Sequence, residues 1–129
     1  MKTKGSVVIL EKEGEFLLQL RDDTNKIQHP NEWGLFGGRI EEGETPINAA
    51  IREIKEELNL NLEEDLLEKV YEFINEKREI TIFRYFLKND LAELKLGEGQ
   101  DMKLFSKEEI SKMNNIIPGV KRLIENLNE

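Results

Sequence analysis

The chain has 129 residues, of which 27 are acidic and 19 are basic, so it carries a formal charge of −8. This negative charge argues against broad binding to nucleic-acid backbones, and the absence of cysteine excludes disulfides, thiolate catalysis and zinc–cysteine sites. No apolar run approaches the roughly 18 residues of a membrane span, and the N-terminus lacks the apolar run of a signal peptide. We therefore expect a cytoplasmic protein without membrane contacts, built as a single domain over residues 1–129.

The N-terminal part of the chain predicts a β-hairpin. Residues 5–10 and 15–20 are β-branched or alternating runs, and Glu13-Gly14 between them is typical of a turn. The segment that follows, Trp33 to Gly38, contains a pair of glycines and is expected to form a loop. Trp33 in this loop is the best candidate among the aromatic residues for stacking on a base, although aromatic side chains more often fill the core.

Residues 45–58 predict a helix with one buried face. Thr45 is a suitable N-cap, Pro46 fits the first helical position, and Asn59 is suited to a left-handed residue at the end. Apolar residues recur at steps of three and four, which is the spacing of a core-facing stripe, at Ile47, Ala50, Ile51, Ile54 and Leu58.

The rest of the chain predicts more strands and two short helices. Residues 66–74 and 79–87 are apolar runs around the polar turn 75–78, and both faces of the second run are apolar, as in a strand covered on both sides. Residues 102–105 form a further short strand, after which Ser106 caps a small helix and Pro118 opens the last one. This order of elements indicates an α/β fold in which a mixed sheet lies between helices.

A strip of carboxylates adjoins the apolar stripe of the first helix. At roughly 100° per residue, Glu53, Glu56 and Glu57 fall together, with Arg52 beside Glu56. Carboxylates at this spacing repel one another unless a cation such as Mg²⁺ binds them. A solvated acidic surface is the alternative interpretation. The preceding residues favour a site, because Gly37 and Gly38 allow close backbone approach and three more glutamates precede the helix.

These residues resemble the Nudix box, the signature of the Nudix hydrolase family. The matching positions are Gly38, Glu44, Arg52, Glu53, Ile54, Glu56, Glu57 and Leu60, with Asn59 in place of the family's glycine. The helix must stop at that position, and Asn is the next best residue there. The resemblance implies an α/β/α sandwich with a mixed sheet and an enzyme that hydrolyses a nucleoside diphosphate linked to another moiety X.

The resemblance also implies roles for individual residues. Mg²⁺, with Mn²⁺ as an alternative, would be held by Glu53 and Glu57, helped by Glu56 and the Gly37 carbonyl. Arg52 and Glu44 would hold these ligands in place. Glu98, in a glycine-flanked loop that would let its carboxylate swing toward a ligand, is similar to a glutamate of MutT-type members that acts as a further metal ligand or as the general base. Either Glu53 or Glu98 could therefore be the base.

Substrate recognition is expected outside this stretch. Arg21, at the end of the second strand, is a candidate phosphate contact, because it is similar to an arginine that contacts phosphate near the corresponding place in MutT-type enzymes. Gly38 lets the substrate approach the backbone. The resemblance favours a nucleoside or deoxynucleoside triphosphate that is cleaved to monophosphate and pyrophosphate. ADP-ribose, a nucleotide sugar and a dinucleoside polyphosphate are alternative substrates, and a nucleotide-binding regulator without catalysis is an alternative function. The chain would act as a monomer or a homodimer.

Overall fold

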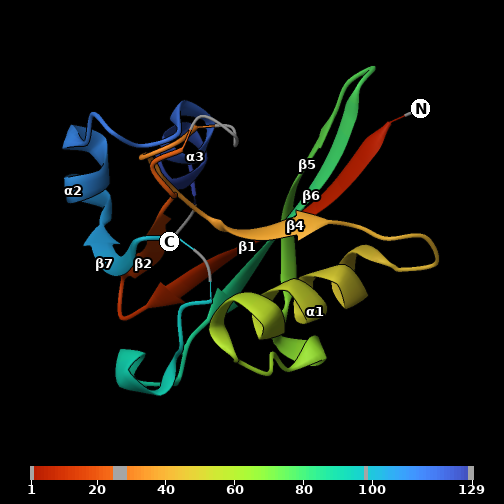
Figure 1. Cartoon of the computed structure of the whole chain (residues 1–129), viewed down its shortest axis with the longest axis horizontal. Coiled ribbons are helices and arrows are strands. Elements are labelled where there is room, and N and C mark those ends of the chain that lie inside the picture. The colour runs from red at the N-terminus through yellow and green to blue at the C-terminus, as the bar shows by residue number, and fades with distance from the viewer. Residues whose placement is uncertain (1, 25–28, 98, 128–129) are drawn as a thin grey trace.

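The computed structural model describes residues 2–24, 29–97 and 99–127, and in this part of the chain a seven-stranded mixed sheet lies between helices (Figure 1). The strands are β1 (Thr3–Lys12), β2 (Glu15–Leu20), β3 (Trp33–Gly34), β4 (Phe36–Arg39), β5 (Glu68–Ile74), β6 (Arg78–Phe86) and β7 (Asp101–Ser106). The helices are α1 (Pro46–Leu58), α2 (Lys107–Lys112) and α3 (Pro118–Glu125). Single 3₁₀ turns form at Glu64–Leu66 and Leu91–Glu93.

Strand β1 holds the two halves of the sheet together. It runs parallel to β6 along its whole length, from Thr3 opposite Arg78 to Glu11 opposite Phe86. Its first half also pairs with β4, whereas its last residues pair with β2 across the Glu13-Gly14 turn. β2 pairs in turn with β3 and β7. The short segment β3–β4 therefore crosses from one half of the sheet to the other, and its β4 end lies beside α1.

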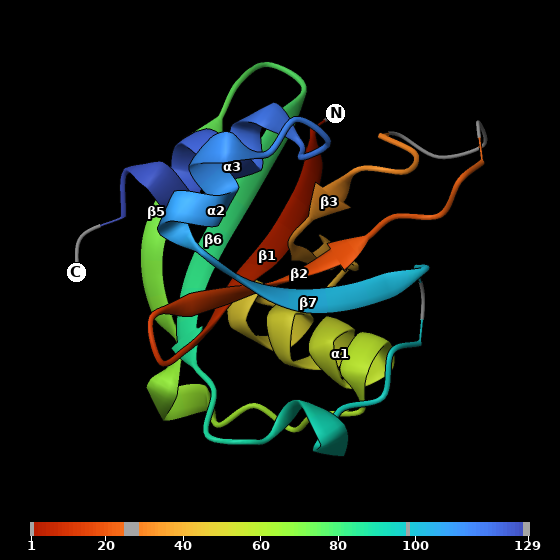
Figure 2. The same ribbon diagram turned by 90° about the vertical axis from the view of Figure 1, so that its left-hand side faces the viewer.

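Figure 2 shows α1 on one side of this sheet and α2 and α3 on the other, and an apolar core lies on each side. Successive residues of β1 alternate between them, because neighbouring side chains of a strand point to opposite faces. Val8 and Leu10 pack with Ile54 and Leu58 of α1, while Ile9 packs with Ile110 of α2 and Ile124 of α3. The predicted mixed sheet between helices is confirmed.

The ends of α1 are set by local chemistry. Thr45 Oγ1 accepts a hydrogen bond from the Asn48 N–H at 3.1 Å, and Pro46 occupies the first turn. Asn59 ends the helix in the left-handed conformation, with φ 53° and ψ 36°. The buried Ser6 hydroxyl donates to the Pro46 carbonyl at 2.7 Å, which fixes the start of α1 on β1. Both predicted ends of this helix are confirmed.

Three features were not expected from the sequence. Residues 33–39 are largely strand and not loop, because their backbone pairs with β2 and β1. The edge strand β5 carries exposed apolar side chains at Tyr71, Phe73 and Ile74. The run Glu63-Glu64-Asp65 includes the start of a 3₁₀ turn. Among the described residues, every helix is too short or too polar to span a membrane.

Candidate active site

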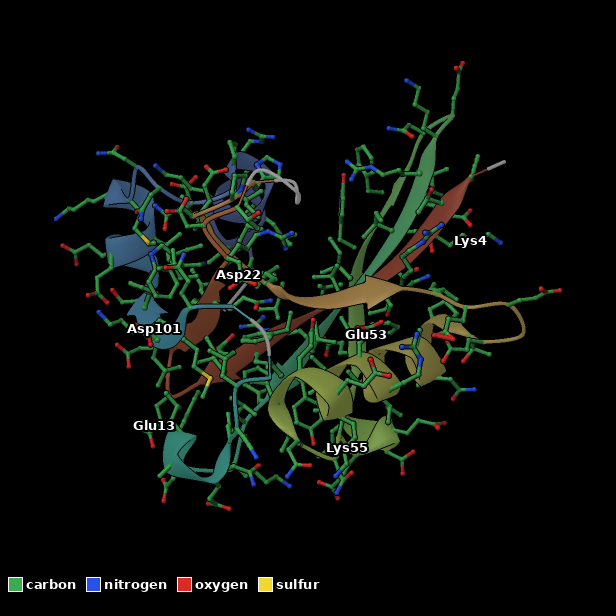
Figure 3. The ribbon with its side chains drawn as sticks, viewed as in Figure 1. Lys4, Glu13, Asp22, Glu53, Lys55 and Asp101 are labelled. Atoms are coloured by element: carbon green, nitrogen blue, oxygen red, sulfur yellow. The ribbon has the colours of Figure 1, made fainter. Side chains whose placement is uncertain are left out.

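The site forms where the two glycines of β4 meet the carboxylates of α1 (Figure 3). The Gly37 N–H donates to Glu57 Oε1 at 2.9 Å. Gly38 lies against Glu53, so that a Cβ at this position would come within 2.5 and 2.6 Å of the two carboxylate oxygens. The absence of a side chain at Gly38 is therefore what gives the Glu53 carboxylate its place.

Gly37 is a glycine for a different reason. Its φ is +150°, and a Cβ here would overlap the Ser6 carbonyl and lie 2.7 Å from Val7 Cα. Both obstacles belong to the backbone of β1 and cannot rotate away. Gly37 thus keeps β4 close to β1, which brings its N–H to Glu57.

Arg52 connects Glu44, which precedes α1, with two glutamates of α1. Its Nε and Nη2 donate to the two oxygens of Glu44 at 2.7 and 2.9 Å, and Nη2 also donates to the Arg39 carbonyl at 2.9 Å. Nη1 donates to Glu53 Oε1 at 3.0 Å and reaches Glu56 Oε1 at 3.4 Å. This fork-like arrangement uses the planar guanidinium, whose donors lie on three nitrogens in fixed directions, whereas an ammonium group has its three donors on a single nitrogen.

The hydrogen bonds from Arg52, assisted by the Glu41 N–H, lower the pKa of Glu44 from 4.5 to about 2. The same bonds, those to Glu44 first and those to Glu53 second, raise the pKa of Arg52. Glu44 and Arg52 therefore stay charged at neutral pH, and the Arg52 side chain remains fixed beside Glu53.

The three predicted metal ligands of α1 lie in different surroundings. Glu57 is only 7% exposed, the Glu53 side chain is 15% exposed and the Glu56 side chain is 59% exposed. Glu53 and Glu57 face β4, whereas Glu56 lies at the solvent edge, where it meets Arg52. The inner pair is thus better placed to share one ion with the β4 backbone.

Among the residues that the structure describes, no three acidic, His or Cys side chains gather closely enough to form a metal-binding group by themselves. Two carboxylates from Glu53 and Glu57 with the Gly37 carbonyl would nevertheless make an all-oxygen set. Mg²⁺ is commonly held by one or two carboxylates and keeps several waters for the remaining positions. The chemistry of these donors therefore fits a hard divalent ion.

A cavity of about 250 Å³ borders the turn before α1 and is lined by residues 2–4 and 39–44. Lys4 and Arg39 bring positive charge to its wall. Glu41, Glu42 and Glu44 line the same cavity, and Lys4 is paired with Glu79 at 3.6 Å, so its wall carries charges of both signs.

The segment before β7 contacts both sides of the site. The Lys95 N–H donates to the Leu58 carbonyl at 3.0 Å, and the Gly97 N–H donates to the Glu57 carbonyl at 2.7 Å. Glu98 itself lies outside the described residues. A Cβ at Gly97 would lie 2.8 Å from the Glu56 carbonyl, and one at Gly99, where φ is +87°, would lie 2.9 Å from the Leu20 carbonyl. These glycines therefore let the backbone before β7 pack closely against the ends of α1 and β2. The sequence had not indicated this role.

Two predicted substrate contacts lie in the other half of the sheet. Arg21 follows β2, and its Cδ is 3.9 Å from the place of a Cβ at Gly34. Trp33 belongs to β3 and is 8% exposed, with its ring edge-on to Phe105 at a centroid distance of 4.9 Å. The prediction that Trp33 lies in a loop is wrong. Its stacking on a base stays a prediction, and the ring would have to leave this packing to do so.

Two buried polar residues near the site were not singled out from the sequence. Ser6 holds the start of α1, and Gln19 Nε2 donates to the Leu35 carbonyl at 3.2 Å, just before β4. The available signal was a polar residue at an inward position of an otherwise apolar strand. Such a residue needs a hydrogen-bond partner inside the protein.

A sequence model of the NUDIX domain matches residues 3–127, which is nearly the whole described chain. The chain belongs to the Nudix family. Members of this family are enzymes that act on nucleoside diphosphates linked to another moiety X, generally with a divalent metal ion. The family predicted from the spacing of Gly38, Glu44, Arg52 and the α1 glutamates is therefore confirmed.

Known proteins with a similar sequence or a similar fold are also described as Nudix hydrolases. Nudix hydrolase 3 of Arabidopsis thaliana is 37% identical over 70 residues, which cover 54% of this chain but only 9% of that much longer protein. A MutT Nudix hydrolase from Burkholderia pseudomallei has a TM-score of 0.77 at 20% identity, covering 99% of both chains. A Nudix hydrolase from Nitrosomonas europaea also has a TM-score of 0.77, at 26% identity, covering 96% of this chain and 70% of that one. These structures share the Nudix fold.

Proposed function

We propose that this chain is a Mg²⁺-dependent Nudix hydrolase that cleaves nucleoside or deoxynucleoside triphosphates to monophosphate and pyrophosphate. One observation supports it above the others: Glu53 and Glu57 are both held against the β4 glycines, next to a fixed Arg52–Glu44 pair. A passive acidic surface has no need of this arrangement. The proposal includes one catalytic domain over residues 1–129, a cytoplasmic location, small nucleotide substrates and no binding to nucleic acid or membranes.

Glu53, Glu57 and the Gly37 carbonyl would hold the metal ion, with Glu56 as a further ligand from the solvent edge. When bound, Mg²⁺ or Mn²⁺ supplies charge neutralisation at the phosphate oxygens and a lowered pKa for the attacking water. Arg52 keeps Glu53 in place through the Nη1–Oε1 hydrogen bond, and Glu44 keeps Arg52 in place. Gly38 leaves the space in which the Glu53 carboxylate sits.

Proton transfer needs a carboxylate that acts as the base. The water that attacks phosphorus must lose a proton, and Glu53 or Glu98 would accept it while the phosphoanhydride oxygen leaves. A base contributes about 10²- to 10⁴-fold to rate. Glu98→Gln should therefore lower kcat at least tenfold if Glu98 is the base, whereas an unchanged kcat assigns this role to Glu53.

Arg21 is the proposed phosphate contact on the β2 side. The aliphatic part of its side chain lies beside Gly34 of β3, whereas the α1 carboxylates lie beside β4. In the proposed complex the polyphosphate lies between Arg21 and these carboxylates. ADP-ribose, nucleotide sugars and dinucleoside polyphosphates contain the same diphosphate and are the competing substrates.

A panel of these nucleotides, assayed with Mg²⁺ for release of pyrophosphate and phosphate, tests the proposal. We expect triphosphates to give pyrophosphate, and Glu57→Gln to abolish most of the turnover because one metal ligand is weakened. Glu108→Gln, which changes an exposed glutamate of α2, is the matched control and should leave turnover unchanged. Turnover of none of the compounds, together with tight nucleotide binding by the Glu57→Gln variant, would instead indicate a regulator.

A further inference from the structure

The two described ends of the connection between β2 and β3 are paired with each other. The Arg21 N–H donates to the Glu32 carbonyl at 2.9 Å, and the Asn31 N–H donates to the Asp22 carbonyl at 3.1 Å. Both ends are largely exposed, and these bonds by themselves form a narrow ladder at the surface. A ladder of this kind opens easily unless a third segment holds it.

The third segment is the chain just before β7, which contributes Gln100. Its Nε2 donates to the Arg21 carbonyl at 2.7 Å and to Asn31 Oδ1 at 3.0 Å, while its backbone N–H donates to the Leu20 carbonyl at 2.8 Å. A side-chain amide has two N–H donors, and here they serve the outgoing and the returning end of the connection. One side chain therefore closes the base of the β2–β3 connection.

The chain on the other side of Gln100 is anchored to α1. Gly97 donates to the Glu57 carbonyl, and the absence of a side chain at Gly97 and at Gly99 lets the backbone lie against α1 and against β2. The start of β7 is thus held between the C-terminal end of α1 and the end of β2. Arg21 lies at the far end of this line of contacts.

We propose that Gln100 is a positioning residue that holds the β2–β3 connection, and with it Arg21, in place for contact with the substrate phosphate. The inference rests on the proposed function, in which Arg21 binds phosphate. Gln100 acts through the Arg21 carbonyl and does not touch the substrate. Its loss should therefore weaken substrate binding and leave the chemical step intact.

The first test is a double-mutant cycle measured by steady-state hydrolysis of a nucleoside triphosphate with Mg²⁺. Loss of a typical hydrogen bond corresponds to about a three- to tenfold change, so Gln100→Ala should raise KM by that factor with kcat within about twofold of the original. Arg21→Ala should raise KM as well. Because Gln100 acts through Arg21, the double variant should have the KM of Arg21→Ala alone.

Two further variants separate positioning from general loosening. Gln100→Glu keeps the shape of the side chain but places a carboxylate opposite two acceptors, so its KM should rise at least as much as that of Gln100→Ala. Asn126→Ala removes an equally short bond from an exposed side chain to a carbonyl, Asn126 Nδ2 to Arg122 at 2.7 Å, and should change no kinetic constant.

Backbone amide exchange of the protein without nucleotide or metal gives a readout that does not depend on activity. Gln100→Ala should speed exchange of the Arg21 and Asn31 amides at least threefold, and Asn126→Ala should not. The inference is overturned if Gln100→Ala leaves the exchange rates of the Arg21 and Asn31 amides unchanged, or if it leaves KM unchanged. It is also overturned if the KM of the double variant is raised by the product of the two single effects. If the wild-type protein hydrolyses no nucleotide, the proposed function fails, and the exchange measurement alone decides about Gln100.

Discussion

Adding one methyl group at Gly38 should displace the Glu53 carboxylate without unfolding the protein. The new Cβ would lie 2.5 and 2.6 Å from the Glu53 oxygens, whereas ordinary contacts begin at 3.4 Å. The carboxylate must therefore move by about 1 Å, a displacement that can cost on the order of 10²-fold in rate. Gly38 is not among the glycines with positive φ, so alanine suits its backbone. The obstacle is the end of a side chain, which can rotate away.

We expect Gly38→Ala to lower kcat/KM about 100-fold and Mg²⁺ affinity about tenfold or more, with a change of at most about 1 kcal/mol in the free energy of unfolding. Nucleotide hydrolysis, calorimetric titration with Mg²⁺ and urea denaturation measure the three quantities. Gly119→Ala is the control, because nothing lies within 4 Å of its added Cβ.

The neighbouring Gly37→Ala should behave in the opposite way. Its Cβ would meet the backbone of Ser6 and Val7 at a positive φ, so this variant should lose about 3 kcal/mol or more of stability. The reasoning is refuted if Gly38→Ala keeps the original kcat/KM and Mg²⁺ affinity, or if it loses as much stability as Gly37→Ala.

The remaining predictions concern Arg52, Glu44 and Asn59. Arg52→Lys should lower kcat/KM about 10- to 100-fold in the hydrolysis assay, since an ammonium group cannot reproduce the two-point contact with Glu44 together with the contact to Glu53; undiminished activity would contradict this role. The pKa of Glu44 is lowered on folding, so its stabilising contribution is complete above pH 4.5 and is lost as pH falls toward 2. The difference in urea stability between wild type and Glu44→Gln should therefore shrink over that range, and a constant difference would rule out this linkage. Asn59→Gly should stay within about 0.5 kcal/mol of wild type in thermal unfolding while Asn59→Ala loses about 1 kcal/mol, whereas equal effects would argue against the left-handed conformation.

The parts that could be predicted from the sequence are those governed by local chemistry. The ends of α1 follow from Thr45, Pro46 and Asn59, whose side chains act on their own neighbours in the chain. The grouping of Arg52 with Glu53 and Glu56 follows from helix periodicity. Such features depend on spacings of a few residues, which a single sequence displays directly.

The parts that could not be predicted depend on distant segments. β3 and β4 are two and four residues long and contain three glycines between them, so they have no side-chain alternation, and their strand character comes from pairing with β2 and β1. The sequence suggested that Gly97 makes the loop around Glu98 flexible. In the structure a side chain at Gly97 would collide with the carbonyl of Glu56, which is some 40 positions earlier in the chain. The burial of Trp33 likewise depends on Phe105 and is invisible in its own neighbourhood.

The parallel pairing of β1 with β6 has a consequence for how the protein folds. The two strands are joined by more than half of the chain, and the metal-binding candidates on β4 and α1 lie entirely within that connection. Ile54 and Leu58 of α1 share a core with Phe83 and Tyr85 of β6, so the packing beneath the site is incomplete until this distant closure has occurred. Closing so long a loop is slow compared with forming the β1–β2 hairpin or a helix turn. The site should therefore form late in folding, and its ligands should bind the native state and not folding intermediates that lack the β1–β6 pairing.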